Sequence, residues 1–405
     1  MSTITKKTVP WSGVGATYTE EEIELVAKVM RETRDTFTQG KYMKQFEVDF
    51  NKYNGSQSAF AVSSCTAALE LAAIVTKVGP GDEVIIPGHT FCASAIPFAR
   101  TGATIVWCDI DPETWIVSAA TIKSRLTKKT KCVIVPHIYG LAADMPPIME
   151  LAKQHGFYIV EDCAQALGAE SSGAKVGSWG DFGCFSFHTH KNITTLGEGG
   201  ILTVKDPELA KFVPGLRHNG LCGFPEPREK YWVPAMGNVD FSLDKIWPYN
   251  FCIGEVQCAL GAKTLERVDQ LVKQRAARAN QFKDAVKKYP ELVFQKIPSG
   301  QTSAWHLLPA RFDGGASGAT NHDFIGLMFN QYGIKVIVQY YPLYRYPMFQ
   351  KGGMGKADCP NTDRYFDNMV SFPFHSWMPE EEFQYMIEST IASVETLRKK
   401  SAKKS

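Results

Sequence analysis

The sequence predicts an α/β protein in which helices cover a mostly parallel sheet, followed by a smaller α+β unit. Two observations support this fold class. Short apolar runs alternate with helical patterns between residues 59 and 204, and several of these runs are apolar on both faces, as buried parallel strands are. After residue 292 the pattern becomes mixed. We therefore expect an N-terminal helical segment at 1–35, a large α/β domain at 36–260 and a small C-terminal α+β domain at 261–405.

Composition excludes several classes of protein. The 405 residues are 44% hydrophobic and 21% charged, with a net charge of +2, which argues against a disordered or fibrous chain and against simple electrostatic binding of nucleic acid. No run of 18 apolar residues predicts a membrane span, and no apolar run follows Lys6 and Lys7 to suggest secretion. The ten cysteines are scattered without a CxxC pair. We expect a cytoplasmic protein with reduced thiols, no metal site and no membrane or nucleic-acid partner.

Local patterns predict the elements of the first two thirds of the chain. Thr19 precedes three glutamates and apolar residues at helical spacing, which indicates a capped helix. Strands and helices then alternate. The expected strands are 59–63, 83–87, 104–108, 132–136, 158–161, 183–187 and 201–204. The expected helices are 67–75, 93–100, 121–126 and 147–155.

The last third begins with a long helical pattern at 256–289 that Pro290 closes. Residues 216–249, rich in glycine, proline and aromatic side chains without periodicity, are expected to form an ordered excursion that carries function. Strands are expected at 292–297, 304–312 and 334–338, and helices at 322–331 and 379–399.

Lys191 and Asp162 are the first candidates for chemistry. Each follows an apolar strand, and open α/β sheets bind ligands at the carboxyl ends of their strands. Taken alone, such a lysine is usually surface decoration, and such an acid caps a helix or binds a metal. With pyridoxal phosphate, the acid would keep the ring nitrogen protonated. The lysine could reach the same ligand if the two strands end side by side.

A third candidate is the segment Ser64, Cys65, Thr66 and Ala67, where a short strand meets a helix rich in small residues. Backbone N–H groups at a helix start bind phosphate, and Ser64, Thr66 and Ala67 would supply them. An ordinary N-cap is the favoured interpretation of this segment by itself. The lysine and the acid in the same sheet favour the cofactor.

These segments resemble the DegT/DnrJ/EryC1/StrS family of sugar aminotransferases, which have the fold-type I architecture and a seven-stranded type of sheet. The resemblance runs through nearly the whole chain and implies pyridoxal 5'-phosphate as cofactor. It assigns the phosphate to Ser64, Thr66, Ala67 and Ser186, and the face of the ring to Phe91. It further implies Asp162 at the ring nitrogen, Gln165 near the ring hydroxyl, Lys191 as the lysine bonded to the cofactor, and Asn250 at the phosphate of a neighbouring subunit.

The resemblance implies an aminotransferase, with Lys191 and Asp162 as catalytic residues. It would act as a homodimer with composite active sites, moving an amino group from L-glutamate to a keto sugar. A nucleotide-linked 4-keto-6-deoxy sugar used for surface polysaccharide is the first choice. The alternative substrates are a small phosphorylated ketone and a keto sugar acid. The alternative functions are a PLP-dependent sugar dehydratase and a non-catalytic regulator that binds the cofactor. Dehydratases of this family carry histidine at the lysine position, whereas Lys191 is retained here.

Four positions depart from the family pattern. Cys65 replaces a common glycine, Cys252 an arginine, and Gln339 and Tyr344 histidines, which leaves the substrate open. Other residues carry open alternatives. His188 and His190 are proton relays, phosphate contacts or packed side chains. For Trp232, Trp247 and Tyr249, packing in the core or in a dimer is favoured over substrate contact. A weaker hypothesis is that the polar residues before the excursion meet an anionic substrate group; these are Arg217, His218 and Asn219.

Overall fold

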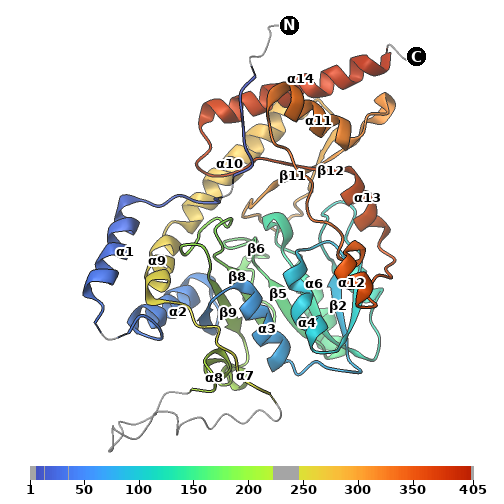
Figure 1. Ribbon diagram of the computed structural model, residues 1–405. Coiled ribbons are helices and arrows are strands. Elements are labelled where there is room, and N and C mark those ends of the chain that lie inside the picture. The colour runs from blue at the N-terminus through green and yellow to red at the C-terminus, as the bar shows by residue number, and fades with distance from the viewer. Residues whose placement is uncertain (1–5, 13, 35, 222–245, 403–405) are drawn as a thin grey trace, which may run out of the picture.

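The computed structural model describes residues 6–12, 14–34, 36–221 and 246–402. Its main feature is a seven-stranded sheet whose strands lie in the order β1, β9, β8, β5, β4, β2, β3 (Figure 1). β9 is antiparallel to both neighbours and the other six strands run the same way, so the predicted mostly parallel sheet is confirmed. The strands are β1 Ser58–Val62, β2 Glu83–Pro87, β3 Thr104–Cys108, β4 Thr130–Pro136, β5 Tyr158–Asp162, β8 Phe182–Ser186 and β9 Gly200–Val204.

Alternate residues of each strand build two separate cores, one on each face of the sheet. In β2, Val84 and Ile86 pack into one cluster and Ile85 into the other. Because side chains alternate along a strand, this split requires helices on both faces. One face is covered by α3 Cys65–Val75, α4 Ile96–Arg100 and α8 Val213–Arg217. The other is covered by α2 Lys41–Asn54, α5 Ala119–Lys123, α6 Met145–His155 and α9 Glu255–Leu265.

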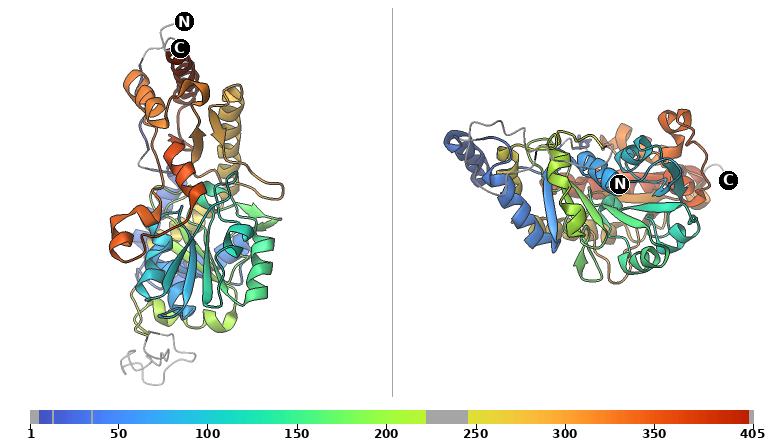
Figure 2. Two further views of the ribbon diagram at one scale, coloured as in Figure 1. Left: turned by 90° about the vertical axis from the view of Figure 1, so that its right-hand side faces the viewer. Right: turned by 90° about the horizontal axis from the view of Figure 1, so that it is seen from below.

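The C-terminal elements form a second layer of structure that stands over one end of the sheet (Figure 2). Here the antiparallel strands β10 Leu292–Phe294, β11 Leu308–Phe312 and β12 Met369–Phe372 share a core with three helices. The helices are α10 Val268–Val286, α11 Asn321–Tyr332 and α14 Glu380–Ala402. The predicted helices at 322–331 and 379–399 are therefore confirmed. The limits of the three predicted domains stay predictions.

The remaining elements are short or peripheral. Helix α1 Glu20–Glu32 begins with the predicted cap, since Thr19 accepts a hydrogen bond from the N–H of Glu22 and the Glu22 side chain accepts one from Thr19 in return. The others are α7 Pro207–Ala210, α12 Pro347–Lys351, α13 Pro360–Asn368, and the strand pair β6 Glu170–Ser171 and β7 Ala174–Lys175. No helix of the described residues is both long and apolar enough to cross a membrane.

The expected long helix at 256–289 is wrong, because the chain breaks between α9 and α10. Arg267 leaves the helical conformation, with φ −107° and ψ 3°. Its guanidinium donates hydrogen bonds to the carboxylate of Glu22 and to the carbonyl of Thr17. A pairing with a distant helix thus accompanies the break, and neither glycine nor proline marks it. The predicted helix at 93–100 is similarly divided into a 3-10 turn at Cys92–Ser94 and α4.

Three expected strands are also wrong in extent or existence. Residues 334–338 form only isolated bridges, Ile334 to Val9 and Ile337 to Ser371, instead of a ladder. The strand expected at 304–312 begins only at Leu308, because Trp305 has φ 49°, which ends an extended run. The element expected at 292–297 is shortened to β10.

Candidate active site

The carboxyl ends of the parallel strands open into a cavity of about 390 Å³. Asp162 ends β5, Ser186 ends β8, and α3 starts directly after β1. Because these strands run the same way, their carboxyl ends lie along one edge. The cavity is thus lined by residues from distant parts of the sequence, and its size is within the usual range for a small-molecule site. Seven of the predicted site residues line it: Ser64, Thr66, Phe91, Asp162, Gln165, Ser186 and Lys191.

Lys191 lies in the loop between β8 and β9. Backbone hydrogen bonds from Phe187 to Gly199 and from Thr189 to Gly197 hold this loop closed, and the Lys191 N–H donates to the carbonyl of His188 at 2.8 Å. Burial lowers the pKa of the Lys191 amine, while the charges of Cys65 and Asp162 oppose that shift. A lowered pKa increases the fraction of neutral amine, which is the nucleophilic form.

Asp162 is buried at the base of the cavity and is held by three groups. Its Oδ2 atom accepts a hydrogen bond from the Ser94 hydroxyl at 2.6 Å, and Oδ1 accepts from the N–H of Ala164 at 3.1 Å. The thiol of Cys65 lies 3.9 Å from Oδ1. The Thr90 and Ser94 hydroxyls are 2.8 Å apart and extend the network. These contacts fix the carboxylate at the position where a cofactor ring nitrogen would meet it.

The start of α3 has the predicted N-cap, and it also presents backbone N–H groups at the cavity, as the phosphate hypothesis requires. The Ser64 hydroxyl caps the helix by accepting from the N–H of Ala67 at 3.1 Å, so that N–H is not available to a phosphate. The N–H groups of Cys65 and Thr66 belong to the first turn, where a helix has no internal acceptor, and both residues line the cavity. Gly200 allows the close approach of β9, since a Cβ atom there would lie 2.4 Å from the Ser64 carbonyl carbon.

Gln165 and Phe91 are placed by two tyrosines that the sequence patterns did not single out. The amide oxygen of Gln165 accepts from the N–H of Tyr139 at 2.7 Å, and its nitrogen donates to the Tyr340 hydroxyl at 3.3 Å. The ring of Phe91 is half exposed beside the cavity and meets Tyr340 edge-on, with ring centroids 5.9 Å apart. An aromatic ring left open on this wall can stack on a planar cofactor.

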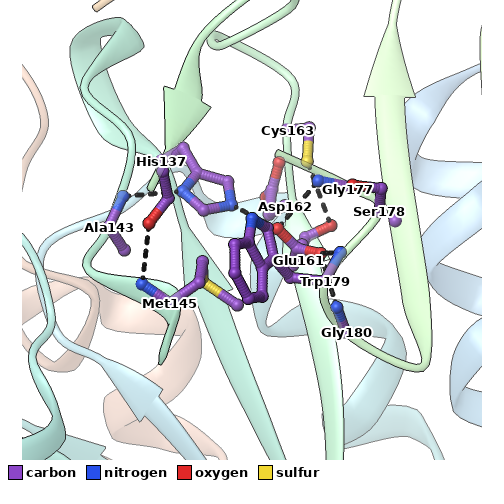
Figure 3. Close-up of polar contacts among 12 residues, drawn as sticks. His137, Ala143, Met145, Glu161, Asp162, Cys163, Gly177, Ser178, Trp179 and Gly180 are labelled. Atoms are coloured by element: carbon purple, nitrogen blue, oxygen red, sulfur yellow. Dashed lines mark hydrogen bonds and ion pairs between the residues drawn. The ribbon is translucent and has the colours of Figure 1, made fainter. Parts of the chain in front are cut away.

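Glu161, next to Asp162, points to the opposite face of β5 and organises the turn before β8 (Figure 3). Its carboxylate accepts from the backbone N–H groups of Gly177, Trp179 and Gly180. The Nε2 atom of His137 lies 3.0 Å from Oε2. Because His137 Nδ1 accepts from the N–H of Ala143, Nε2 carries the proton and donates it to Glu161.

His137, Glu161 and Cys163 also bring potential metal-ligand atoms close together. Both ring nitrogens of His137 are engaged in hydrogen bonds, and both oxygens of Glu161 accept from backbone donors. Burial raises the pKa of the Cys163 thiol well above its ordinary value, which disfavours the thiolate that a metal would need. This group therefore positions the strand ends and does not offer a metal site.

Several predicted residues lie elsewhere. Asn250 is exposed and outside the cavity, and its side chain accepts from the N–H of Cys252 at 3.3 Å. The hypothesis that Arg217 meets an anionic substrate group is wrong, because Arg217 is buried and pairs with Glu47 at 2.6 Å. His218 and Asn219 do not line the cavity either. Core packing is excluded for Trp247, which is 86% exposed. Tyr249 stacks on Phe251, and Trp232 lies outside the described residues.

Some of the four residues that depart from the family pattern line the cavity and others do not, and both histidines near Lys191 line it. Cys65 and Gln339 line the cavity, and so do His188 and His190, whose rings meet edge-on at 4.8 Å. Tyr344 is buried outside it with its hydroxyl bonded to Asp363, and Cys252 accepts from the Gln39 amide. Of the four departures from the family pattern, only Cys65 and Gln339 therefore line the cavity.

Sequence reasoning missed Ser94, Tyr139, Tyr340 and His306, although Tyr139 and Tyr340 each follow an expected strand, at 132–136 and 334–338. A hydroxyl or aromatic residue carries no local signal of its own, so only the folded chain brings these side chains to the cavity. Ser94 has the clearest role among them, since it holds the Asp162 carboxylate.

The donors and acceptors of the cavity fit pyridoxal phosphate. A carboxylate, an amine, unpaired helix N–H groups and an open aromatic face match its ring nitrogen, aldehyde, phosphate and ring. This fold and site therefore define a class of protein: an enzyme that uses pyridoxal phosphate and a reactive lysine.

Comparison with known proteins narrows this class. Residues 16–390 match the model of the DegT/DnrJ/EryC1/StrS aminotransferase family. The spore coat polysaccharide biosynthesis protein SpsC of Bacillus subtilis is 32% identical over 91% of this chain and 93% of its own length. The GDP-perosamine synthase of Caulobacter vibrioides is 40% identical over 57% of this chain and 58% of its own.

A solved structure agrees with these relatives. Spr1654 from Streptococcus pneumoniae, in its PLP-form, superposes with a TM-score of 0.82 at 28% identity over 96% of this chain and 100% of that one. The chain belongs to the DegT/DnrJ/EryC1/StrS aminotransferase family, and the predicted family, fold and enzyme class are confirmed. Pyridoxal phosphate is the cofactor of this family, as predicted.

Proposed function

We propose that this enzyme transfers an amino group from L-glutamate to the keto group of a nucleotide-linked sugar, with a 4-keto-6-deoxy sugar as first choice. The observation that carries the proposal is the Lys191 amine, its pKa lowered by burial, in one cavity with the Asp162 carboxylate. Relatives named for polysaccharide biosynthesis and for a GDP-linked product support the substrate class and a role in surface polysaccharide.

The residues divide the work of amino transfer between them. Pyridoxal phosphate, when bound, supplies an electron sink for the charge left on the carbon that loses its proton. Asp162 would hold the proton of the ring nitrogen, and Ser94 holds Asp162. The N–H groups of Cys65 and Thr66, with Ser186, would hold the phosphate. The neutral Nζ atom of Lys191 would take the proton from the donor carbon as a general base and deliver it to the cofactor carbon as a general acid.

We propose a homodimer with composite active sites, in which Asn250 reaches the phosphate in the other subunit. Its exposure, outside the cavity of its own chain, supports a role toward a second copy. The exposed Trp247 and Tyr249 nearby supply apolar surface for such an interface. We place the enzyme in the cytoplasm, where thiols stay reduced, since the nine cysteines of the described residues are free.

An absorbance experiment tests the amino transfer. The cofactor-loaded enzyme is scanned before and after L-glutamate, and a panel of nucleotide-linked keto sugars, keto sugar acids and phosphorylated ketones is then added. We expect glutamate to remove the cofactor band and one nucleotide-linked keto sugar to restore it, with the amino sugar found by mass spectrometry. A band insensitive to every amino donor would contradict the proposal, and a deoxygenated product would indicate a dehydratase.

A further inference from the structure

A second, smaller cavity of about 70 Å³ adjoins the cofactor cavity. Four residues line both cavities: His190, His306, Gln339 and Tyr340. Its other walls come from the N-terminal segment, α10 and the chain after β12. The volume is several times the roughly 10–15 Å³ that one water molecule needs, so a small polar group of a substrate fits.

A buried positive charge forms one wall of this second cavity. Arg275 of α10 is 2% exposed and makes no ion pair with any acid of the described residues. Its guanidinium donates through Nε and Nη2 to the carbonyl oxygens of Trp305, His306 and Phe374. These bonds fix the side chain but do not neutralise it, since a carbonyl has only a partial charge. Within the described chain, Nη1 has no hydrogen-bond acceptor.

Two further side chains of the second cavity have nitrogen atoms without a partner. His375 is 5% exposed, and its Nδ1 atom is buried with no hydrogen bond to the described residues. The Nε2 amide of Gln339 is also buried without an acceptor there. Leaving such polar groups buried without a partner destabilises the fold, so a ligand that pairs with them gains binding energy. An acceptor on a ligand would satisfy the Gln339 amide, and it would also satisfy His375 in the tautomer that carries its proton on Nδ1.

The electrostatics of the second cavity favour an anion. None of the residues that line it is an aspartate or glutamate. Burial lowers the pKa of Arg275 to about 9, so the guanidinium stays charged at neutral pH. The pKa of His306 is lowered well below its ordinary value, first by burial and then by the charges of Lys191 and Arg275. His306 lines both cavities, with Lys191 in the wall of the first and Arg275 in the wall of the second.

We propose that the second cavity binds a carboxylate group of a substrate, held by Arg275, His375 and Gln339. The carboxylate is positioned beside the carbon that reacts near Lys191. A planar guanidinium suits a carboxylate better than a lysine ammonium does, because it presents paired donors. The proposal rests on the aminotransferase function proposed above and names a substrate group for it. The carboxylate belongs either to the amino donor or to a keto sugar acid.

Calorimetry with glutarate tests the cavity without turnover. We expect glutarate to bind the cofactor-loaded enzyme and its neutral diamide not to bind. Arg275→Lys should weaken glutarate at least tenfold, and His375→Asn several-fold. Arg278→Lys is the matched control, because Arg278 lies on the same helix, donates to the Met378 carbonyl and does not line the cavity. If Arg275→Lys does not fold, His375→Asn decides, because the buried Nδ1 atom of His375 has no hydrogen bond to the described residues that the change would remove.

The two half-reactions then identify the source of the carboxylate. If the variants need a higher half-saturating concentration of glutamate alone, the cavity binds the carboxylate of the donor. If they need a higher half-saturating concentration of the keto acceptor alone, it binds the carboxylate of the acceptor. Unchanged glutarate binding and unchanged half-saturation for both partners in folded variants would overturn the proposal. Failure of the proposed function is a different result, since the wild-type enzyme would then show no response to any donor while glutarate binding is still measurable.

Discussion

Asp162 shows how single residues set the chemistry of this enzyme. Its carboxylate is buried, yet the Ser94 hydroxyl and the Ala164 N–H bind it directly. Such hydrogen bonds compensate for the loss of water and keep the charge in place. Lys191 has the opposite character, since burial lowers its pKa and favours the neutral amine. The structure therefore fixes the position of the carboxylate and lowers the pKa of the amine, and amino transfer uses both groups.

Asp162→Asn should retain cofactor but lose roughly 10²- to 10⁴-fold in the rate of the glutamate half-reaction, because an amide cannot hold the ring nitrogen's proton. Ser94→Ala should lose about tenfold, since one hydrogen bond to a charged group is worth about 1.5 kcal/mol. Stopped-flow absorbance measures both rates. A rate within twofold of wild type for Asp162→Asn would contradict the role of this carboxylate.

Residue patterns identified Lys191 and Asp162 because each stands in a recognisable segment at the end of a strand. The residues that support them had no such signal. Gln339 stood out only as a departure from the family pattern, Tyr340 follows an expected strand that the structure does not form, and Arg275 lies in a helical pattern that gives no indication of its burial. Their roles depend on contacts between distant segments, which local patterns do not contain.

Among the elements, β5 carries two acids with separate tasks on its two faces. Asp162 lines the cavity, while Glu161 accepts hydrogen bonds from three backbone N–H groups of residues 177–180 and one from the Nε2–H group of His137 (Figure 3). Glu161 thus joins the carboxyl ends of β4 and β5 to the turn that leads into β8. It is a positioning residue for the strand ends that line the cavity.

Glu161→Gln should destabilise the fold by about 3–5 kcal/mol, because the new amide NH₂ group would face backbone donors in a buried site. Denaturant unfolding measures the change. Glu150→Gln is the control, since Glu150 is exposed on α6 and bonds only the Gln154 side chain; it should change stability by less than about 0.5 kcal/mol. A loss below about 1 kcal/mol for Glu161→Gln would show that the network does not hold these strand ends.

Helices and strands whose apolar residues recur at regular spacing were predicted well, whereas elements shaped by distant contacts were not. The strands of the large sheet and helices α11 and α14 follow directly from apolar spacing. The break between α9 and α10 accompanies the pairing of Arg267 with Glu22 of α1. The late start of β11 follows from the positive φ of Trp305. Neither cause is visible within the segment it alters.

For the whole molecule, buried histidines make folding stability depend on pH. His89 is buried with Nε2 2.7 Å from the Tyr139 hydroxyl, and burial lowers its pKa from 6.5 to about 3. Below pH 6.5 the unfolded chain binds a proton at His89 that the folded chain does not bind. The folding stability therefore decreases as the pH is lowered from 6.5 towards the folded pKa of about 3.

The His89 contribution should be about 2 kcal/mol at pH 5 relative to pH 7.5, from about 1.4 kcal/mol per pH unit below 6.5. Urea unfolding of wild type and His89→Gln at the two pH values measures it, and the variant should show a pH dependence smaller by this amount. Equal pH dependence in both proteins would exclude His89 as a source.

The assembly provides a second test at this scale. Asn250→Ala should weaken cofactor retention without changing the dimer, because its side chain would act across the interface. Trp247→Glu should dissociate the dimer and also weaken retention, because it places a charge on exposed apolar surface. Light scattering and equilibrium dialysis measure the two effects. Unchanged retention in a pure Asn250→Ala dimer would remove the role of Asn250 across subunits.

The central claim, that Lys191 is the reactive lysine of an aminotransferase, has a direct test. Sodium borohydride fixes pyridoxal phosphate to the lysine that binds it, and peptide mass spectrometry locates the label. We expect the label on the peptide that contains Lys191, and no label there when the enzyme is first treated with L-glutamate. A label on another lysine, or none on the cofactor-loaded enzyme, would contradict the account.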